Sequence, residues 1–522
     1  MSDVQIQSSK ESRPTGAAAP RTITVRSPAN GEVLGEIPVM TEQDVRDAIR
    51  RARTAQKAWA LLPIEERCRR VAKVGDLFVE KCDALVDLLV REAGKPRHEA
   101  LAHEVLPTVN ACHYYTRNAP QFLANKTIDL QLLKHRRSYV KHVPMGVIGV
   151  ISPWNFPLVL PMSPVLEAII AGNGVVVKPS EVTPLIMLEA KRLIDEAGVP
   201  PDLVQVVTGD GATGAALVRG GVQKIHFTGA VNTGRRVGME CAQVFIPCVL
   251  ELGGKAPAIV LEDADVERTA HSIVDGGFAN SGQVCISIER VLVHESVHDA
   301  LVDRVVQLTK ELRQGDPTTK EVDVGAIIFP KQIDIAEAHI RDAVAKGAIV
   351  ATGGRRGPEP GMYFEPTVLT NCRLDMTVMN EEIFGPVVPI MKVRDEEEAI
   401  RIANDSELGL NAYVFSGDRE RGCEVAERIE AGSIVVNDVL INYGAPETPF
   451  GGIKQSGWGR THGEDSIRAM CYARHINYDR MSLPFREPWT YPYTRSKYSQ
   501  LKTVLKGLFS RHGFMGKIAD LF

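Results

Sequence analysis

Short runs of β-branched and apolar residues alternate with longer helical segments through the middle of this chain. In the first series the runs cover residues 147–151, 175–178, 204–208 and 224–228. A second series covers residues 258–261, 291–294 and 434–437. Strands that are separated by helices pair in parallel, because the helix carries the chain back across the sheet. The sequence therefore predicts an α/β fold with two α/β domains, the first built on a doubly wound parallel sheet.

Composition sets limits on the class of protein. The 522 residues suffice for about three ordinary domains or two large ones. Lys and Arg number 61 against 65 Asp and Glu, so the net charge of −4 gives no overall field for holding nucleic acid. The nine cysteines form no close pairs, which is typical of a reduced cytoplasmic protein rather than a disulfide scaffold.

The N-terminal part predicts a leader and then helices. Residues 1–21 contain no apolar run, which favours a disordered leader over a secretory signal. Residues 41–120 have a helical pattern with Thr41 as a candidate N-cap, and residues 137–142 alternate like an edge strand or arm. The apolar stretch 143–177 contains five prolines, so we expect a buried strand, a loop and a core helix there, not a membrane span.

The C-terminal tail is basic. Residues 495–522 contain six Lys and Arg and one acid, and apolar side chains recur at helical spacing at positions 501, 504, 505, 508 and 509. One interpretation is a helix packed on a neighbouring domain or subunit. The other is a basic amphipathic helix that makes peripheral contact with a membrane surface.

Two loops are candidates for holding a phosphate at a helix N-terminus. The first, residues 209–214, is a literal G-x-G-x-x-G with Gly211 and Gly214, but Asp210 adds a negative charge, and a plain strand-to-helix turn is the alternative. The second, residues 229–234, follows another strand and contains no acid. Lys178 and Glu181 stand at the end of a strand, where they could bind the ribose of a nucleotide or be ordinary surface residues.

Cys285 is the candidate nucleophile. It lies in a polar turn, Asn280-Ser-Gly-Gln-Val-Cys285, whereas the other cysteines lie mainly in helical or apolar surroundings. Asn155 follows a buried strand and offers an amide that could stabilise an oxyanion. Glu251 lies in apolar company before two glycines, where burial would raise its pKa toward the range of a general base.

Several of these segments together resemble the aldehyde dehydrogenase superfamily. They appear in the family's order across about residues 22–480, and the wording around Cys285 is similar to that of succinate-semialdehyde-type members. The matching segments are 153–157, 178–181, 227–229, 251–255, 282–285, 382–386 and 449–457.

The resemblance implies roles for individual residues. Cys285 would be the nucleophile, Glu251 the general base and Asn155 the oxyanion donor. The remaining matched residues would bind NAD, with NADP as the alternative: Ile151, Ser152, Pro153, Trp154, Lys178, Ser180, Glu181, Phe227, Thr228, Gly229, Ala230, Gly234, Leu252, Glu382 and Phe384. It also favours residues 229–234 over Gly211 and Gly214 as the phosphate loop.

The resemblance further implies a domain plan. A Rossmann-like dinucleotide-binding domain would span residues 22–126 and 144–251, and a catalytic domain residues 252–450. A β-arm of residues 127–143 and 451–480 would join subunits in a homodimer or homotetramer, followed by the tail 481–522. Departures from the family are Ala230 in place of a serine, Thr461 and His462 in place of the usual Glu-x pair, and the long tail.

The implied activity is oxidation of a small-molecule aldehyde to a carboxylic acid through a thiohemiacetal and a thioester on Cys285. Two alternatives remain open at this point. His294-Glu-Ser-Val-His298 matches the H-E-x-x-H of zinc metallopeptidases, but Ser296 is expected to cap a helix from Val297, which would split the pair. A catalytically silent structural protein on the same scaffold would be expected to lack the nucleophile or the base, and both are present.

Overall fold

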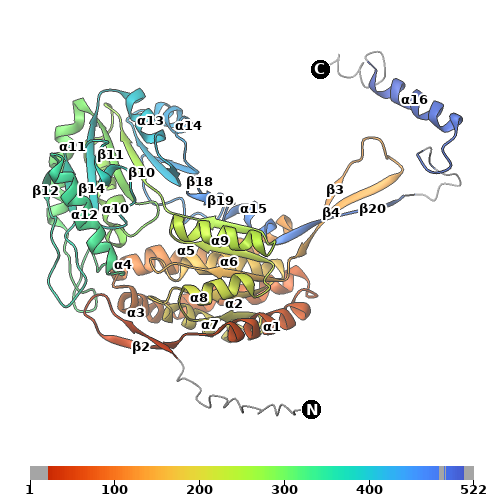
Figure 1. Ribbon diagram of the computed structural model, residues 1–522, viewed down its shortest axis with the longest axis horizontal. Helices are drawn as coiled ribbons and strands as arrows, with labels where there is room; N and C mark the ends of the chain where they lie inside the picture. Colours follow the sequence, from red (N-terminus) through yellow and green to blue (C-terminus); the bar gives the residue numbers. More distant parts are fainter. Residues whose placement is uncertain (1–20, 481–486, 488, 511–522) are drawn as a thin grey trace, which may run out of the picture. The chain divides into compact units, whose positions relative to one another are not determined.

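The computed structural model describes residues 21–480, 487 and 489–510 (Figure 1). The chain divides into two compact units. The first comprises residues 21–124 and 142–472, and the second residues 125–141 and the described residues from 473 onward. The predicted leader 1–20 and the tail residues 481–486, 488 and 511–522 lie outside the described residues.

The first unit contains a six-stranded sheet in the order β19-β9-β8-β5-β6-β7. Its central strands are parallel, and only β19 is antiparallel to its neighbour. The strands are β5 (Val147–Ile151), β6 (Gly174–Lys178), β7 (Val204–Val206), β8 (Lys224–Thr228), β9 (Cys248–Glu251) and β19 (Gly457–Trp458).

Helices cover both faces of this sheet because its strands are apolar on both sides. On β5, Val147 and Ile151 point to one helical layer, and Ile148 and Val150 to the other. The first layer consists of α1 (Glu42–Trp59), α8 (Gly211–Arg219) and α9 (Val231–Gln243). The second consists of α2 (Ile64–Glu80), α3 (Cys82–Ala93), α5 (Leu106–Phe122), α6 (Val159–Ala171) and α7 (Leu185–Glu196).

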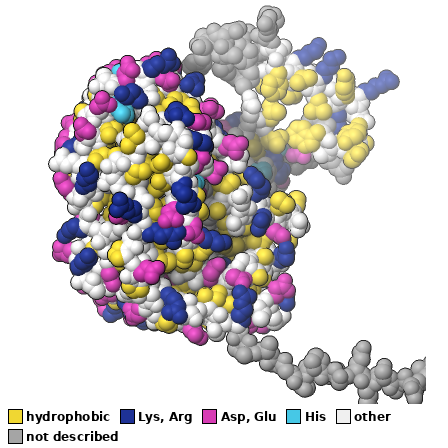
Figure 2. Space-filling view, turned by 60° about the vertical axis from the view of Figure 1, so that its left-hand side comes forward, with side chains coloured by type: hydrophobic (Ala, Val, Ile, Leu, Met, Phe, Trp, Pro, Cys, Tyr) yellow, Lys and Arg dark blue, Asp and Glu magenta, His cyan; other side chains and the backbone are white. Residues whose placement is uncertain are grey.

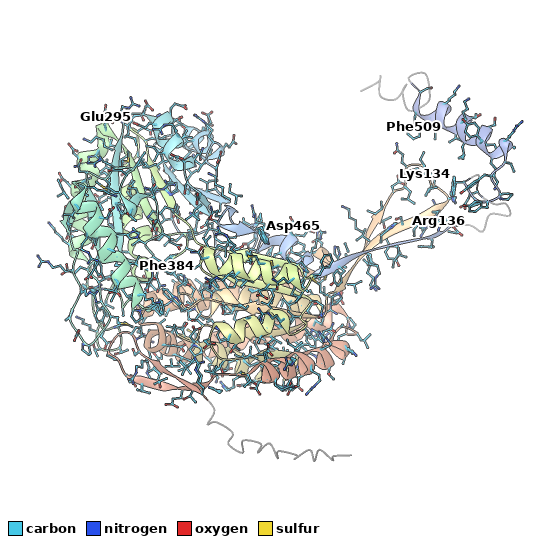
Figure 3. The ribbon with its side chains drawn as sticks, in the orientation of Figure 1. Lys134, Arg136, Glu295, Phe384, Asp465 and Phe509 are labelled. Atoms are coloured by element: carbon cyan, nitrogen blue, oxygen red, sulfur yellow. The ribbon has the colours of Figure 1, made fainter. Side chains whose placement is uncertain are left out.

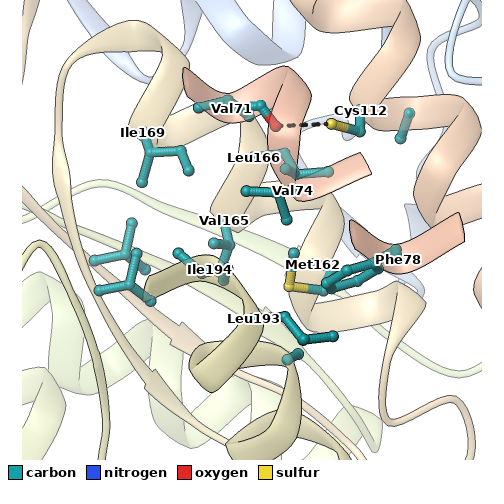
Figure 4. Close-up of a cluster of buried hydrophobic side chains, with 14 of the residues drawn as sticks. Val71, Val74, Phe78, Cys112, Met162, Val165, Leu166, Ile169, Leu193 and Ile194 are labelled. Atoms are coloured by element: carbon teal, nitrogen blue, oxygen red, sulfur yellow. Dashed lines mark hydrogen bonds between the residues drawn. The ribbon is translucent and has the colours of Figure 1, made fainter. Parts of the chain in front are cut away.

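Figure 4 shows part of the core on the second face, where Phe78, Met162 and Leu193 from three helices meet. The thiol of Cys112 donates a hydrogen bond to the backbone oxygen of Val71 over 3.3 Å. Between α3 and α5 the chain forms α4 (Arg97–Ala100) and a π-helical turn, η1 (Leu101–Val105).

A second sheet of seven strands, ordered β12-β13-β14-β11-β10-β16-β17, completes the first unit. The strands are β10 (Ala256–Val260), β11 (Ile288–His294), β12 (Ile349–Thr352), β13 (Thr367–Thr370), β14 (Val387–Val393), β16 (Asn411–Phe415) and β17 (Ser433–Val436). Its helices are α10 (Val266–Phe278) and α11 (Glu295–Glu311) on one face, and α12 (Lys331–Ala345), α13 (Glu396–Asn404) and α14 (Arg419–Glu427) on the other.

Smaller elements connect these layers. They are the hairpin β1 (Thr22–Arg26) and β2 (Val33–Pro38), the pair β15 (Leu408–Gly409) and β18 (Ile453–Lys454), helix α15 (Gly463–Arg468), and 3₁₀ turns η2 (Ala279–Gly282) and η3 (Thr377–Met379).

The second unit contains an antiparallel hairpin and a separate helix. The hairpin is β3 (Lys126–Ile128) with β4 (Arg136–Pro144), and β20 (Cys471–Asp479) lies beside β4 in the same sheet. Helix α16 (Arg495–Phe509) begins after Thr494, whose hydroxyl accepts the N–H of Lys497 over 3.2 Å. None of its side chains is buried among the described residues.

The predicted alternation of strands and helices is confirmed, and it gives the expected α/β fold with parallel sheets. Thr41 caps α1 in a capping box with Asp44, β4 forms where an edge strand or arm was expected, and α16 forms where the tail's apolar spacing indicated a helix. Strands β12, β13, β14 and β16 of the second sheet were not among the predicted strands. No helix in the described residues has both the length and the apolar character needed to cross a membrane.

Candidate active site

A single cleft of about 810 Å³ in the first unit brings the three predicted catalytic side chains together. Asn155 follows β5, Glu251 ends β9, and Cys285 precedes β11 of the other sheet. Phe384, labelled in Figure 3, also lines this cleft where the parts of the unit built on the two sheets meet. The three predicted catalytic residues, up to 130 positions apart in the sequence, therefore face one space.

The predicted cofactor residues also line this cleft, with Gly234 as the exception. Gly234 lies one layer behind, where a Cβ atom would come within 2.3 Å of the Leu252 side chain. The lining members are Ile151, Ser152, Pro153, Trp154, Lys178, Ser180, Glu181, Gly211, Gly214, Phe227, Thr228, Gly229, Ala230, Leu252, Glu382 and Phe384.

Sequence reasoning missed part of the lining. Phe329 comes from the segment that leads into α12 and Gln332 from the first turn of that helix, and no motif marks either residue. The ring of Phe329 lies 5.9 Å from that of Trp154, and Phe384 meets Trp154 edge-on at 5.3 Å. Gln332 donates to the backbone oxygens of Ile383 and Phe384. The other unpredicted lining residues are Leu160, Ala215, Val218, Thr233, Arg236, Val237, Glu240, Gly253 and Ile335.

The two candidate phosphate loops differ at their helix N-termini. In the first loop Asp210 caps α8: its carboxylate accepts the N–H of Ala212 over 2.9 Å and pairs with Arg21 at 2.7 Å. That carboxylate takes the place an anion would occupy. In the second loop the N-cap of α9 is Ala230, with no side-chain hydrogen bond to the helix. The positive end of α9 therefore remains available to a phosphate at the cleft.

The turn before Cys285 is held in an unusual backbone conformation. Asn280, Ser281 and Gly282 have φ angles of 48°, 57° and 72°. A left-handed non-glycine residue costs of order 1 kcal/mol or more, so the turn needs external support. The Glu99 carboxylate accepts the N–H of Asn280 over 2.9 Å, and the Ser281 hydroxyl donates to the Gly325 oxygen over 3.0 Å.

Gly282 and Gln283 fix the same turn. A Cβ atom on Gly282 would lie 2.2 Å from the backbone oxygen of Gly385, so only glycine fits. The side-chain amide of Gln283 donates to the Asn280 oxygen over 2.7 Å, and its carbonyl accepts the N–H of Ile328 over 2.7 Å. The loop that carries Cys285, the candidate nucleophile, is thus pre-organised by buried polar contacts.

Asn155 is tied to this turn. Its side-chain amide donates to the Gln283 backbone oxygen over 3.0 Å, while its own backbone oxygen accepts the Asn280 side chain over 3.0 Å. One N–H of the amide is engaged in this way, which leaves the second available to a substrate oxygen. Its side-chain oxygen is buried and has no partner in the structure.

A buried ion pair supports Asn155 from behind. The Lys95 ammonium contacts the Glu104 carboxylate at 2.7 Å and donates to the Asn155 backbone oxygen over 2.9 Å. The second oxygen of Glu104 accepts the N–H groups of Leu158 and Val159, each over 3.0 Å. Lys95 and Glu104 are almost fully buried, and Glu104 comes from the π-helical turn η1. The pair joins η1 to the loop that carries Asn155.

The segment 449–457 holds Glu251 in place. The N–H of Leu252 donates to the Ser456 backbone oxygen over 3.1 Å, and the Ser456 hydroxyl donates to Gly253 over 2.7 Å. A Cβ atom on Gly451 would lie 2.9 Å from the Glu251 carboxylate, so the glycine makes room for it. One carboxylate oxygen of Glu251 is buried and has no hydrogen-bond partner in the structure.

Burial dominates the electrostatics around the nucleophile. It raises the pKa of the Cys285 thiol to about 12, helped by the carboxyls of Glu251 and Glu382. Burial also raises the pKa of Glu251 well above its usual value, and that of Glu382 to about 8. Every charged side chain that shifts the Cys285 pKa is a carboxyl. A buried carboxyl with a raised pKa beside a neutral thiol suits a base that accepts a proton during the reaction.

The H-E-x-x-H segment does not form a metal site. His294 ends β11 and caps α11, which begins at Glu295, so the expectation that Ser296 caps a helix from Val297 is wrong by two residues. The Nδ1 atom of His294 accepts the Ser296 N–H, while His298 contacts Asp299. The junction still splits the pair, and within the described residues no cluster of three or more His, Cys, Asp and Glu side chains could hold a metal ion.

The two parts of the first unit, one built on each sheet, meet at a cleft that a thiol, an amide and a buried carboxylate line. This fold and this site define an oxidoreductase with a dinucleotide cofactor. Residues 15–476 match the model of the aldehyde dehydrogenase family. The chain belongs to this family, and it catalyses NAD(P)-dependent oxidation of an aldehyde.

Relatives and solved structures agree with this assignment. The chain is 37% identical over 499 residues to a 4,4'-diapolycopene aldehyde oxidase of Methylomonas sp, covering 95% of this chain and 92% of the relative. It is 39% identical over 439 residues to a putative NADP⁺ succinate-semialdehyde dehydrogenase of Mycolicibacterium smegmatis, covering 84% and 85%. An aldehyde dehydrogenase of Bacillus cereus in complex with NAD⁺ superposes with a TM-score of 0.85 at 35% identity, covering 88% of this chain and 94% of that one.

The Lys95–Glu104 pair yields the first prediction. Lys95→Met leaves the Glu104 charge buried and unpaired, so we expect a loss of about 3–5 kcal/mol in the free energy of unfolding. We also expect kcat to fall about tenfold or more, because the Asn155 loop shifts. In Lys95→Met/Glu104→Gln the stability should largely return while kcat stays low.

Denaturant unfolding and steady-state kinetics measure the two effects. The control is Arg91→Met, which breaks an exposed pair with Glu32 and should change neither quantity appreciably. Recovery of both stability and kcat in the double variant would show that the pair serves stability alone.

The Cys285 pKa yields a second prediction. Alkylation of the cofactor-free enzyme by iodoacetamide should be slow at neutral pH and rise with pH toward about 12, because only the thiolate reacts. Glu251→Gln removes a negative charge that raises this pKa, so the midpoint of the alkylation profile should move to lower pH.

Mass spectrometry of the Cys285 peptide measures the rate at each pH. Glu240 lines the same cleft but does not shift the Cys285 pKa, so Glu240→Gln is the matched control and should leave the midpoint in place. An unchanged or higher midpoint in Glu251→Gln contradicts the electrostatic account.

Proposed function

We propose that the enzyme oxidises apolar aldehydes to carboxylic acids through a thioester on Cys285 that water hydrolyses with Glu251 as the base. The observation that carries this proposal is the convergence of Cys285, Asn155 and Glu251 on one cleft. Glu251 bears on which product forms, because a base that activates water leads to hydrolysis of the thioester and to a free carboxylic acid.

The proposed steps use the chain's own groups. The Cys285 thiol releases its proton to solvent water, and its sulfur adds to the aldehyde carbon, which gives a tetrahedral thiohemiacetal. The Asn155 amide and the Cys285 backbone N–H donate to the oxyanion, and one such donor is worth about 3 kcal/mol. A bound NAD(P) would supply hydride acceptance at this carbon, and loss of the hydride would leave a thioester on Cys285. Glu251 then takes a proton from water, whose oxygen attacks the thioester and releases the acid and the thiol.

The residues around the cleft fit a dinucleotide. Both Gly229 and Gly253 line the cleft. A Cβ atom on Gly229 would come within 2.7 Å of the Phe227 ring and one on Gly253 within 2.6 Å of the Glu382 carboxylate, so only glycine leaves these two lining side chains in place. We propose that Glu181 accepts the ribose hydroxyls and favours NAD. Lys178 contacts Glu181 at 3.0 Å and offsets part of its charge, which keeps NADP as the alternative.

The surroundings of Cys285 favour an apolar substrate. The side chain packs against a cluster formed by Phe156, Val159, Leu160, Val284, Ile286, Leu410, Leu440, Tyr443 and Phe450. A semialdehyde would bring its carboxylate into this apolar region and toward Glu251 and Glu382. That carboxylate would lose hydration, and no positive side chain among the groups that shift the Cys285 pKa would compensate its charge. Between the two relatives, the one named for 4,4'-diapolycopene aldehyde is therefore the better guide to the substrate than the one named for succinate semialdehyde.

We also propose an oligomeric state and a cellular location for the enzyme. In the β3–β4 hairpin only Ser138 is buried, and β3 has no strand on its outer side among the described residues, which leaves that edge free to pair in a homodimer or homotetramer. The domain plan given above, with its arm of residues 127–143 and 451–480, is part of this proposal. All nine cysteines lie among the described residues as free thiols, which fits the proposed cytoplasmic location.

The thioester mechanism yields a third prediction. Glu251→Gln should retain a burst of one reduced cofactor per site and then turn over at least a hundredfold more slowly, because hydrolysis lacks its base. Cys285→Ala should show neither burst nor turnover while keeping its unfolding midpoint. Stopped-flow absorbance of the reduced cofactor measures both. A Glu251→Gln enzyme with normal steady-state turnover would remove Glu251 from the mechanism.

Substrate class yields a fourth prediction. The value of kcat/KM should rise with aldehyde chain length, by up to about fourfold for each buried methylene. At equal length an ω-carboxylate should lower it at least tenfold. Paired aldehydes, such as pentanal and succinate semialdehyde, measure the effect with one enzyme preparation. Equal or higher kcat/KM for the carboxylated partner would contradict the apolar assignment.

A further inference from the structure

Helix α16 has an unpartnered apolar face. Tyr498 is 68% exposed, Val504 51% and Leu505 60%, although residues of this kind normally seek burial. At 3.6 residues per turn, the apolar side chains of the helix lie within an arc of about 140°. They are Tyr498, Leu501, Val504, Leu505, Leu508 and Phe509.

The charges on α16 are all of one sign. Arg495, Lys502 and Lys506 lie along one border of the apolar arc, and the helix contains no acid. Lys497 falls inside the arc near its other border, and its ammonium donates to the Thr490 backbone oxygen over 2.7 Å. None of these four forms an ion pair with any described residue. Lysines beside an apolar face can extend their ammonium groups to a polar boundary while their stems cover apolar surface.

The rest of the second unit extends this character. Its described residues contain eleven Lys and Arg against three Asp and Glu, a net charge of +8 within a chain of net charge −4. Trp489, Tyr491 and Tyr493, just before the helix, are 47%, 71% and 69% exposed. Aromatic side chains of this kind are enriched at membrane–water boundaries. Figure 2 shows apolar and basic side chains gathered together on this part of the protein.

We propose that α16, with the aromatic residues 489–493, docks the enzyme on an anionic lipid surface. The helix would lie in the plane of the surface, with its apolar arc among the acyl chains and its lysines and arginine at the phosphates. At 15 residues and about 22 Å it is too short to span a bilayer. A lipid surface accounts for both features of the helix at once, because it supplies negative headgroups beside an apolar interior.

Vesicle co-sedimentation of the full-length enzyme tests this docking independently of the proposed function. Vesicles of phosphatidylglycerol and phosphatidylcholine should pellet the wild-type protein, and vesicles of phosphatidylcholine alone should not. Salt at about 0.5 M should weaken the binding, because the Debye length falls to a few Å. Lys502→Gln/Lys506→Gln should lower partitioning about 30-fold.

A matched pair of variants separates the apolar face from a general effect on the helix. Leu501→Gln/Leu505→Gln places two glutamines on the apolar arc and should lower partitioning at least 30-fold. Ser499→Gln/Thr503→Gln places the same residues, at the same spacing, on the polar face and should bind like the wild type. All variants should oxidise a short water-soluble aldehyde at the wild-type rate, since none of these residues lines the cleft.

Three results would overturn the proposal. The wild-type protein could fail to pellet with anionic vesicles, or Leu501→Gln/Leu505→Gln could pellet like the wild type. In the third, Leu501→Gln/Leu505→Gln would change the native mass measured by light scattering, which would assign the apolar face to a contact between copies of this chain.

Discussion

The left-handed turn at residues 280–282 is the constraint on which the catalytic geometry depends. Two non-glycine residues with positive φ store strain, and only a surrounding structure that over-determines them keeps them there. That surrounding structure comes from distant parts of the chain: Glu99 from the helical layer of the first sheet, and Gly325, Ile328 and Gly385 from segments next to the second. Asn155 is held through the same turn, so the proposed nucleophile and oxyanion donor share one support. The site therefore forms only when both sheets have packed together.

Burial also explains the resting charge of the site. Ionised groups are costly in a low-dielectric cleft, and the raised pKa values of Cys285, Glu251 and Glu382 follow from this cost. Two buried ion pairs lie near the cleft. Lys95 and Glu104 bind backbone groups of the Asn155 loop, and Glu289, which pairs with Lys255, binds a backbone group of the Glu382 loop. These charged pairs thus hold the backbone of the two loops in place, while the groups proposed to react stay neutral until a proton is transferred. This division leaves no positive side chain among the charged groups that shift the Cys285 pKa, and the proposed preference against a carboxylated substrate rests on the lack of such a partner.

The sequence predicts those features of the fold that local residue patterns control. Strand–helix alternation gave the parallel sheets, Thr41 gave the cap of α1, and the spacing of Leu501, Val504 and Leu505 gave α16. Lys95, Gln283 and Phe329 escaped notice because their contacts join residues far apart in sequence, and neither residue type nor spacing marks such a contact. The cap of α11 was misplaced although the strand was predicted to end at His294: Ser296 is the commoner capping residue, but the helix begins directly after the strand at Glu295, so the ring of His294 takes that role. Resemblance to a family located the cleft residues, while the supports behind them required coordinates.

Overall composition conceals a segregation of charge that bears on where the enzyme works. The described part of the second unit has a net charge of +8, so all other residues together carry −12. A near-neutral total excludes a uniform attraction to polyanions, but it leaves room for a local positive surface that acts within a Debye length. An apolar aldehyde concentrates in lipid and is scarce in water, so an enzyme with an apolar pocket gains substrate by residing at that boundary. The exposed basic helix and the apolar surroundings of Cys285 belong to different parts of the chain, yet both suit an aldehyde that partitions into membranes.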